Sequence, residues 1–221
     1  MGIFGNIKGA IASNLKHARN QALKLTNQLE EIKEASEFVA LLHEGDKLIN
    51  LSGSIVKTMM NIYNLRRQEA QALKELSEIF GSSRSDTNSE AINRIEFFSL
   101  QEHSTYMVYL NEKLNSVFMD LEIFVKKDSV THATLQKNYR TAKRDYEFVL
   151  VDQRDNPVLY TEENSTILGE KENDYLQHAR LYGEFIEEFI NQFNETFIPL
   201  VEKLFAIDKE MYFDLHHTLA S

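Results

Sequence analysis

The chain has 221 residues, no cysteine and a formal net charge of -10. The absence of cysteine excludes a disulfide framework, a thiolate zinc site and a cysteine nucleophile. A hydrophobic content of 43% is that of a globular protein. Because the sequence has no apolar run of about 18 residues and no secretory signal pattern at its start, we expect a cytoplasmic protein that does not span a membrane.

The first element in chain order is an amphipathic segment over residues 1–26. On a helical wheel its apolar side chains fall within about 120° of one another, its cations lie off that face, and residues 1–29 contain no acid. This pattern is typical of a helix that inserts into a membrane interface. The alternative is a helix that docks on the rest of the chain. The residues expected to contact the membrane are Ile3, Phe4, Ile7, Lys8, Ile11, Leu15, Lys16 and Arg19.

Residues 27–221 are predicted to form one all-α domain. Apolar residues recur three and four positions apart over about 27–80, 90–153 and 170–219, separated by breaker-rich stretches. The whole chain has only 8 Gly and 2 Pro, and Pro199 should kink the third helix. A helix of about 60 residues is roughly 90 Å long, and a thin rod of three such helices buries little surface per residue. We therefore expect a kinked antiparallel coiled-coil bundle that forms a homodimer.

Large aromatic and methionine residues gather on either side of the loop at 81–89 and near the C-terminus. Such side chains are enriched in the cores of protein interfaces. They predict a dimer interface, with an intramolecular core as an equally weighted alternative. The residues are Met59, Met60, Tyr63, Phe97, Phe98, Tyr106, Met107, Tyr109, Leu204, Phe205, Tyr212 and Phe213.

The most basic stretch of the chain is KKDSVTHATLQKNYRTAKR, residues 126–144, in which six of nineteen residues are cationic and one is acidic. Four of the cations fall within about 60° of one another on a helical wheel. Like charges crowded on one face indicate an anionic partner, although a solvated helix face is the simpler alternative. The predicted binding residues are Lys126, Lys127, Lys137, Arg140, Lys143 and Arg144.

The sequence favours a phospholipid surface over nucleic acid as this partner, because zinc and RNP-type motifs are absent and the third helix is strongly acidic. It also contains no H-E-x-x-H, P-loop or G-x-S-x-G motif. We therefore expect no enzymatic activity, catalytic residue, metal site, cofactor or small-molecule substrate.

Several of these stretches together resemble the N-BAR domain of amphiphysin-like proteins. They are the GIF start with its basic amphipathic segment, FVKKD at 124–128, KRDYE at 143–147 and FNETFIPLVEKLFAIDKEMYFDL at 193–215. The resemblance covers nearly the whole chain. It implies a crescent-shaped homodimer of three-helix coiled coils that binds anionic membranes through its concave face. It also implies curvature sensing or generation, in endocytosis or membrane tubulation, and leaves open a heterodimer with another BAR protein.

The loop between the second and third helices departs from the family, in which it is basic. Residues 152–174 are mostly acidic and polar here, with a short apolar run at Val158, Leu159 and Tyr160. These three residues either insert into a bilayer or cap the end of the bundle. The competing prediction for the whole chain is a helical dimeric scaffold that binds proteins and does not contact lipid.

Overall fold

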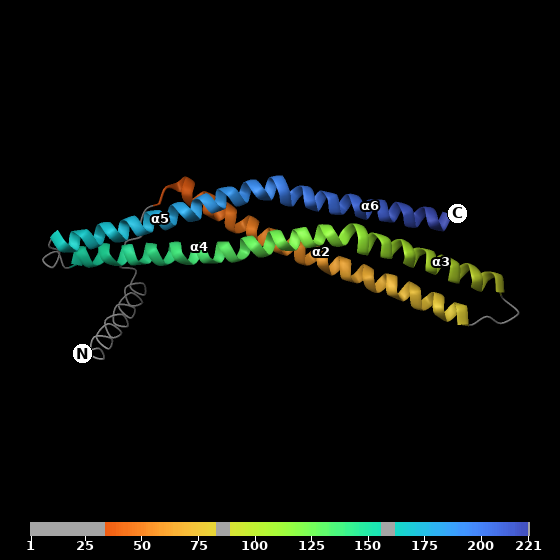
Figure 1. Cartoon of the computed structure of the whole chain (residues 1–221). Helices are drawn as coiled ribbons and strands as arrows, with labels where there is room; N and C mark the ends of the chain where they lie inside the picture. The colour runs from red at the N-terminus through yellow and green to blue at the C-terminus, as the bar shows by residue number, and fades with distance from the viewer. Residues whose placement is uncertain (1–33, 83–88, 156–161, 221) are drawn as a thin grey trace, which may run out of the picture. The chain divides into compact units, whose positions relative to one another are not determined.

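The structure is a computed structural model that describes residues 34–82, 89–155 and 162–220, and Figure 1 shows its ribbon. Within these ranges the chain is helical from Ser36 onwards and contains no strand. The helices in chain order are α2 (Ser36–Ser82), α3 (Ser89–Val108), a π-helical turn (Tyr109–Leu114), α4 (Asn115–Asp155), α5 (Glu162–Gln192), a second π-helical turn (Phe193–Phe197) and α6 (Ile198–Ala220). Because each π-helical turn continues directly into the next helix, the chain forms three long helices. The predicted all-α class is confirmed.

The third long helix begins at Glu162, eight residues before the predicted start at 170. Gly169 and its polar neighbours had indicated a loop. A Cβ added at Gly169 would meet no atom within 4 Å, so the glycine sits in open space and costs the helix only propensity, about 1 kcal/mol. The start of the first helix was predicted at residue 27, which lies outside the described residues.

Pro199 lies just after the second π-helical turn. A proline in a helix removes one N–H donor and its ring crowds the carbonyl of the fourth residue before it, Glu195. The backbone N–H of Ile198 bonds to the carbonyl of Phe193, five residues earlier. The local widening of the helix thus occurs where the proline disrupts regular α-helical bonding, and such single π turns are a common accommodation.

The chain divides into two compact units, which are described separately. Unit 1 contains the described residues 34–42, 131–155 and 162–186. Unit 2 contains the described residues 43–82, 89–130 and 187–220.

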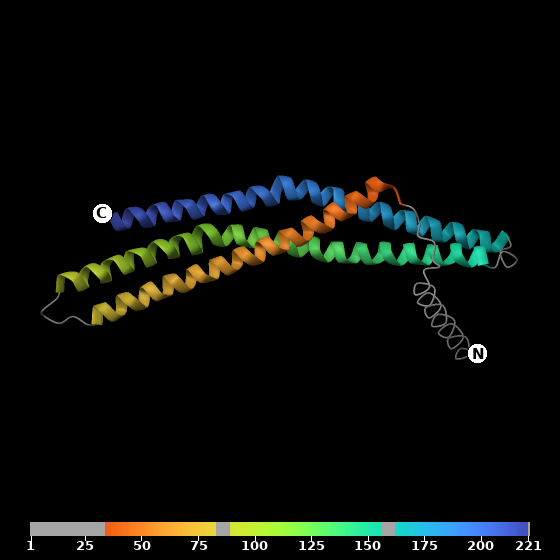
Figure 2. The ribbon, with the colours of Figure 1, turned by 180° about the vertical axis from the view of Figure 1, so that it is seen from behind.

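In unit 2, α2 and α3 form an antiparallel hairpin, and α6 lies beside α3 in both views of the ribbon (Figures 1 and 2). Tyr63 donates a hydrogen bond to the carbonyl of Leu110, while His103 contacts the carbonyl of Ala70 at 2.7 Å. Aromatic rings fill the interior, with Phe124 5.3 Å from Phe197 and 5.7 Å from Phe189 between ring centroids. Aromatic pairs at this spacing are favourable beyond their buried area.

In unit 1, α4 and α5 run antiparallel and the first residues of α2 cover them. His132 of α4 lies 2.9 Å from the Tyr182 hydroxyl of α5. The Phe38 ring of α2 packs on α4 through Tyr139, and on α5 at Gly183. A Cβ at Gly183 would lie 3.0 Å from the Phe38 ring, so the absence of a side chain allows this close approach.

Candidate functional site: a cationic helix and an exposed apolar surface

The basic stretch at 126–144 lies entirely within α4. Lys126 and Lys127, in unit 2, are exposed, as are Lys137 and Arg140, in unit 1. Asp128, the single acid of the stretch, is buried at 6% exposure. Every exposed charged side chain of the stretch is therefore a cation. The surface of the stretch carries positive charge only, whereas its sequence also contains one acid.

The buried carboxyl group of Asp128 has a pKa above its ordinary value. Burial is the main cause, since a low-dielectric environment disfavours the charged form. The Lys127 ammonium group opposes the rise and the Glu188 carboxylate adds to it. The one acid of the stretch therefore lies beneath the surface on which the cations are exposed.

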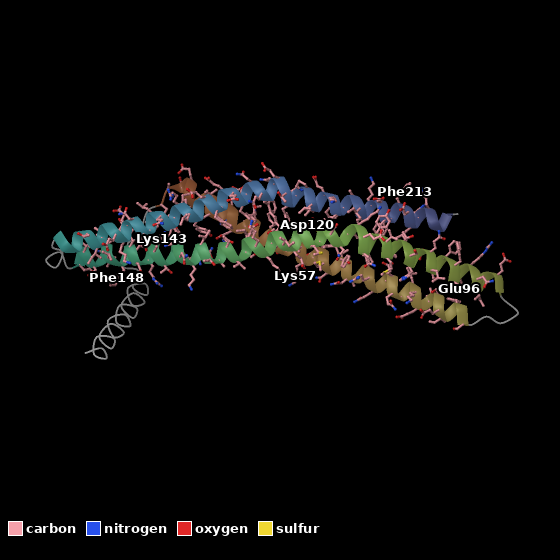
Figure 3. The ribbon with its side chains drawn as sticks, in the orientation of Figure 1. Lys57, Glu96, Asp120, Lys143, Phe148 and Phe213 are labelled. Carbon is pink, nitrogen blue, oxygen red and sulfur yellow. The ribbon has the colours of Figure 1, made fainter. Side chains whose placement is uncertain are left out.

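Lys143, which is labelled in Figure 3, was predicted to belong to the membrane-binding face, and in the structure it forms an ion pair with Glu34. Its Nζ lies 2.9 Å from Oε2 of Glu34, and the side chains of Lys143 and Glu34 are 24% and 9% exposed. The wheel position of Lys143 did not reveal this, because Glu34 comes from a segment about a hundred residues away. Lys143 is therefore engaged within unit 1 rather than directed at solvent.

The Glu34 carboxylate is the centre of a polar cluster that joins the start of α2 to α4 and α5. Tyr139 of α4 and Tyr175 of α5 each donate a hydroxyl to Glu34, the second at 2.8 Å. Burial raises the pKa of Glu34, but the hydrogen bonds from Tyr139, Lys143 and Tyr175 outweigh it and hold that pKa below its ordinary value. Burial and the Glu34 carboxylate raise the pKa of both tyrosines. We call Glu34, Tyr139, Lys143 and Tyr175 the Glu34 cluster.

Arg144 is half-buried. Its Nε has no hydrogen-bond partner and lies 3.9 Å from Oδ1 of Asp145. Asp145 also lies 3.9 Å from Lys171 of α5, through its other oxygen. These distances are too long for direct hydrogen bonds. Because Arg144 is half-buried and Arg140 is exposed, Arg144 is less available to an external partner than Arg140.

The remaining residues predicted to contact a membrane lie outside the described residues. They are Ile3, Phe4, Ile7, Lys8, Ile11, Leu15, Lys16 and Arg19 of the N-terminal segment and Val158, Leu159 and Tyr160 of the loop before α5.

The residues predicted to form a dimer interface divide into two groups, all within unit 2. Five are buried inside the chain, as the intramolecular alternative expects: Met59, Tyr63, Tyr106, Tyr109 and Leu204. Three are half-buried: Met60, Phe98 and Met107. Four are exposed by more than half of their surface: Phe97, Phe205, Tyr212 and Phe213. The last of these is labelled in Figure 3.

Sequence reasoning missed other apolar side chains that unit 2 exposes. The missed residues that are at least 47% exposed are Ile62, Leu65, Ile79, Met119, Ile123 and Val130. The sequence pattern that could have revealed them is the width of the apolar face of each helix, which is broader than packing against one neighbouring helix requires. Exposed apolar side chains that are contiguous, as Ile62 and Phe205 are along one groove, indicate a protein or membrane contact.

A groove of about 350 Å³ lies in this surface of unit 2. Its apolar lining includes Ile55, Met59, Ile62, Phe118 and Phe205. Arg66 and Asp208 also line it and form an ion pair, with Arg66 Nη2 2.7 Å from Asp208 Oδ2. The groove is thus open, mostly apolar and bordered by a fixed charge pair.

A second polar contact fixes α6 against the π-helical turn of the second long helix. The Tyr109 hydroxyl donates to Asp214 at 2.5 Å, and Lys113 pairs with Glu210 at 2.7 Å. Burial, followed by the bond to Asp214, raises the pKa of Tyr109 to about 12. These contacts set the register of α6 and so determine where the exposed rings of α6 lie.

In the ranges 34–82, 89–155 and 162–220, no three His, Asp or Glu side chains gather as a metal site would require. None of the helices in those ranges is long and apolar enough to cross a bilayer. Comparison with known proteins gives the chain no family, since no family model and no curated protein matches its sequence.

Proposed function

We propose that the chain is a dimeric helical scaffold that binds anionic membranes and senses or generates their curvature. The observation that carries this proposal is the charge of the 126–144 stretch, where the exposed charged residues are Lys126, Lys127, Lys137 and Arg140 and the one acid is buried. The sequence resemblance to amphiphysin-like N-BAR domains points the same way.

The dimer is supported by the apolar surface of unit 2. Exposed rings such as Phe205 and Phe213 cost solvation free energy in a lone chain, about 25 cal/mol for each Å² left in water. A second copy would cover them. Two copies would also present twice as many surface cations, and cations held in one assembly bind a charged surface more tightly than separate ones do.

Each cation near an anionic bilayer contributes about 1 kcal/mol, and the contribution is screened beyond the Debye length. Each unit supplies one pair of exposed cations, and a pair contributes up to about 2 kcal/mol, or roughly thirtyfold in affinity. The chain as a whole is acidic, so this attraction is local and should fall with added salt.

Co-sedimentation with vesicles over a salt series tests the proposal. Vesicles containing phosphatidylserine should bind the protein at low salt, while purely zwitterionic vesicles of the same size should bind it weakly. Tubules or small vesicles seen by negative-stain electron microscopy would support curvature generation. Equal, weak binding to both vesicle types at low salt would contradict the membrane function.

The second candidate is a dimeric scaffold that binds proteins only. Two observations favour it: Lys143 is paired with Glu34, and Arg144 is partly buried. The stretch therefore has fewer exposed cations than the six in its sequence. Dimerisation without vesicle binding would select this candidate.

A further inference from the structure

Unit 1 contains an open groove that no described residue fills. It has a volume of about 500 Å³ and lies between the start of α2 and the α4–α5 pair. Tyr146 and Tyr175 line it with stacked rings, 5.8 Å apart between centroids and inclined by 20°. Phe38 and Leu176 also line it. The groove is therefore large enough, and apolar enough, to receive two or three side chains of a helix.

Leu176 is an unusual residue for its position. It is 53% exposed on a stretch of α5, KENDYLQHAR, that is otherwise largely polar. An isolated exposed leucine needs no explanation, but this one borders a hollow with aromatic walls. A ligand seated in the groove would cover it.

The geometry of the chain indicates which ligand lies nearest. Glu34 both lines the groove and is tied there by Tyr139, Lys143 and Tyr175. The 33 preceding residues are therefore joined to the chain at the border of the groove. A tethered segment of this length has an effective concentration of about a millimolar at a nearby site, which favours it over a separate protein segment of similar affinity.

Charge and pattern also fit this segment. Residues 1–29 contain four Lys and Arg residues and no acid. The α5 side of the groove carries Glu172 in its lining, with Asp174 exposed nearby. Arg180 also lines the groove, but its guanidinium group lies 3.7 Å from the Glu184 carboxylate. The apolar face of the segment, which contains Phe4 and Ile7, matches the apolar walls, and its cations match these carboxylates.

We propose that, in the absence of a membrane, the N-terminal segment docks by its apolar face in this groove of unit 1. The same face is the one expected to insert into a bilayer, so docking and insertion exclude each other. Docking therefore inhibits membrane binding, because the apparent vesicle affinity equals the affinity of the undocked form multiplied by the undocked fraction. The docking itself is independent of the proposed membrane function, whereas its role as a brake rests on that function.

The chain offers a clean reporter for docking because it has no tryptophan. In a Phe4→Trp protein without vesicles, acrylamide quenching of the single indole measures its shielding from solvent. Leu176→Glu should weaken docking by about tenfold, since it removes burial of one leucine side chain. Leu181→Glu is the matched control, because Leu181 is an exposed leucine of the same helix that does not line the groove.

The expected result is a shielded indole in the reporter and in its Leu181→Glu form, and an accessible indole in its Leu176→Glu form. Glu172→Lys, which reverses a charge in the groove lining, should also increase quenching, and most strongly at low salt. Unchanged helicity by circular dichroism shows that the variants remain folded. An indole that is equally accessible in all forms, or equally shielded in all forms, overturns the proposal.

Vesicle co-sedimentation of the same proteins separates the two proposals. If the brake operates, Leu176→Glu binds phosphatidylserine vesicles up to about tenfold more tightly than Leu181→Glu. If the unsubstituted protein fails to bind vesicles at low salt, the membrane function is wrong, and the quenching result still decides whether the segment docks. If vesicle binding is normal and the indole is accessible in all forms, the docking proposal alone fails.

Discussion

Unit 1 and unit 2 are built from the same three long helices, yet they differ in how many apolar side chains they expose and in the contacts that join their helices. Unit 2 exposes fifteen large apolar side chains and unit 1 exposes four, for 116 and 59 described residues. Unit 1 instead joins its three helices through a half-buried carboxylate held by two tyrosines and a lysine. Per residue, unit 2 exposes about twice as many large apolar side chains, which supports the proposed dimer contact in unit 2.

The largest expected effect concerns the dimer. Phe205→Glu together with Phe213→Glu should weaken self-association by about a thousandfold, because each exposed ring at the centre of an interface is worth roughly 2 kcal/mol. Sedimentation equilibrium measures the change. The control pair, Val39→Glu with Ile167→Glu, alters exposed apolar residues of unit 1 and should leave the dimer intact. A double control that dissociates as much as the unit 2 pair would remove the contrast between the units.

The next effect concerns the Glu34 cluster. Glu34→Gln should destabilise unit 1 by about 1–3 kcal/mol, because Lys143 loses its ion-pair partner in a partly buried site and the tyrosine hydrogen bonds lose their charge. Hydrogen exchange of α5 amides measures this locally. Glu184→Gln is the control, because Glu184 makes an exposed pair with Arg180 at 3.7 Å and such pairs contribute about 0–1 kcal/mol. Equal losses of amide protection in both variants would show that the Glu34 cluster stabilises unit 1 no more than an exposed ion pair does.

The pH dependence of the same cluster follows from the lowered pKa of Glu34. A carboxyl group with a folded-state pKa below its unfolded-state value stabilises the fold above the unfolded-state value. That stability is lost as the pH falls below 4.5, the ordinary value, and through the folded-state pKa. We expect the protection of α5 to decline in this acidic range in the unsubstituted protein and to decline less in Glu34→Gln. A loss that begins near neutral pH would point to another group.

The smallest effect concerns backbone propensity in unit 1. Gly169→Ala should stabilise α5 by about 0.5–1 kcal/mol, because the site is helical and open. Gly183→Ala gains the same propensity but places a Cβ 3.0 Å from the Phe38 ring, so its net effect should be smaller or opposite. Urea denaturation followed by circular dichroism compares the two. A larger gain at Gly183 than at Gly169 would contradict the close packing of α2 on α5.

The sequence predicted the helices well because their apolar spacing and the scarcity of breakers are local properties. It placed the end of the first helix within two residues of Ser82, since a Gly- and Ser-rich loop follows. It could not separate Met59, which is buried, from Phe205, which is exposed, because both lie on apolar stripes. Only the packing of distant helices decides which stripe faces inward. Lys143 shows the same limit, since its partner Glu34 is remote in sequence.

We propose that the cationic stretch of α4 contacts an anionic membrane, and charge reversal of its exposed cations is the sharpest test of that contact. The variant carries Glu at Lys126, Lys127, Lys137 and Arg140, and the control carries Glu at four exposed cations of α2 and α3: Lys47, Lys57, Lys74 and Arg94. Both variants change the net charge equally, so a difference between them reports position rather than overall charge. In co-sedimentation with phosphatidylserine vesicles at low salt, the α4 variant should lose most of its binding, with a weakened salt dependence, while the control retains the larger part. Equal binding by the two variants would contradict the account and leave the stretch as a solvated helix face.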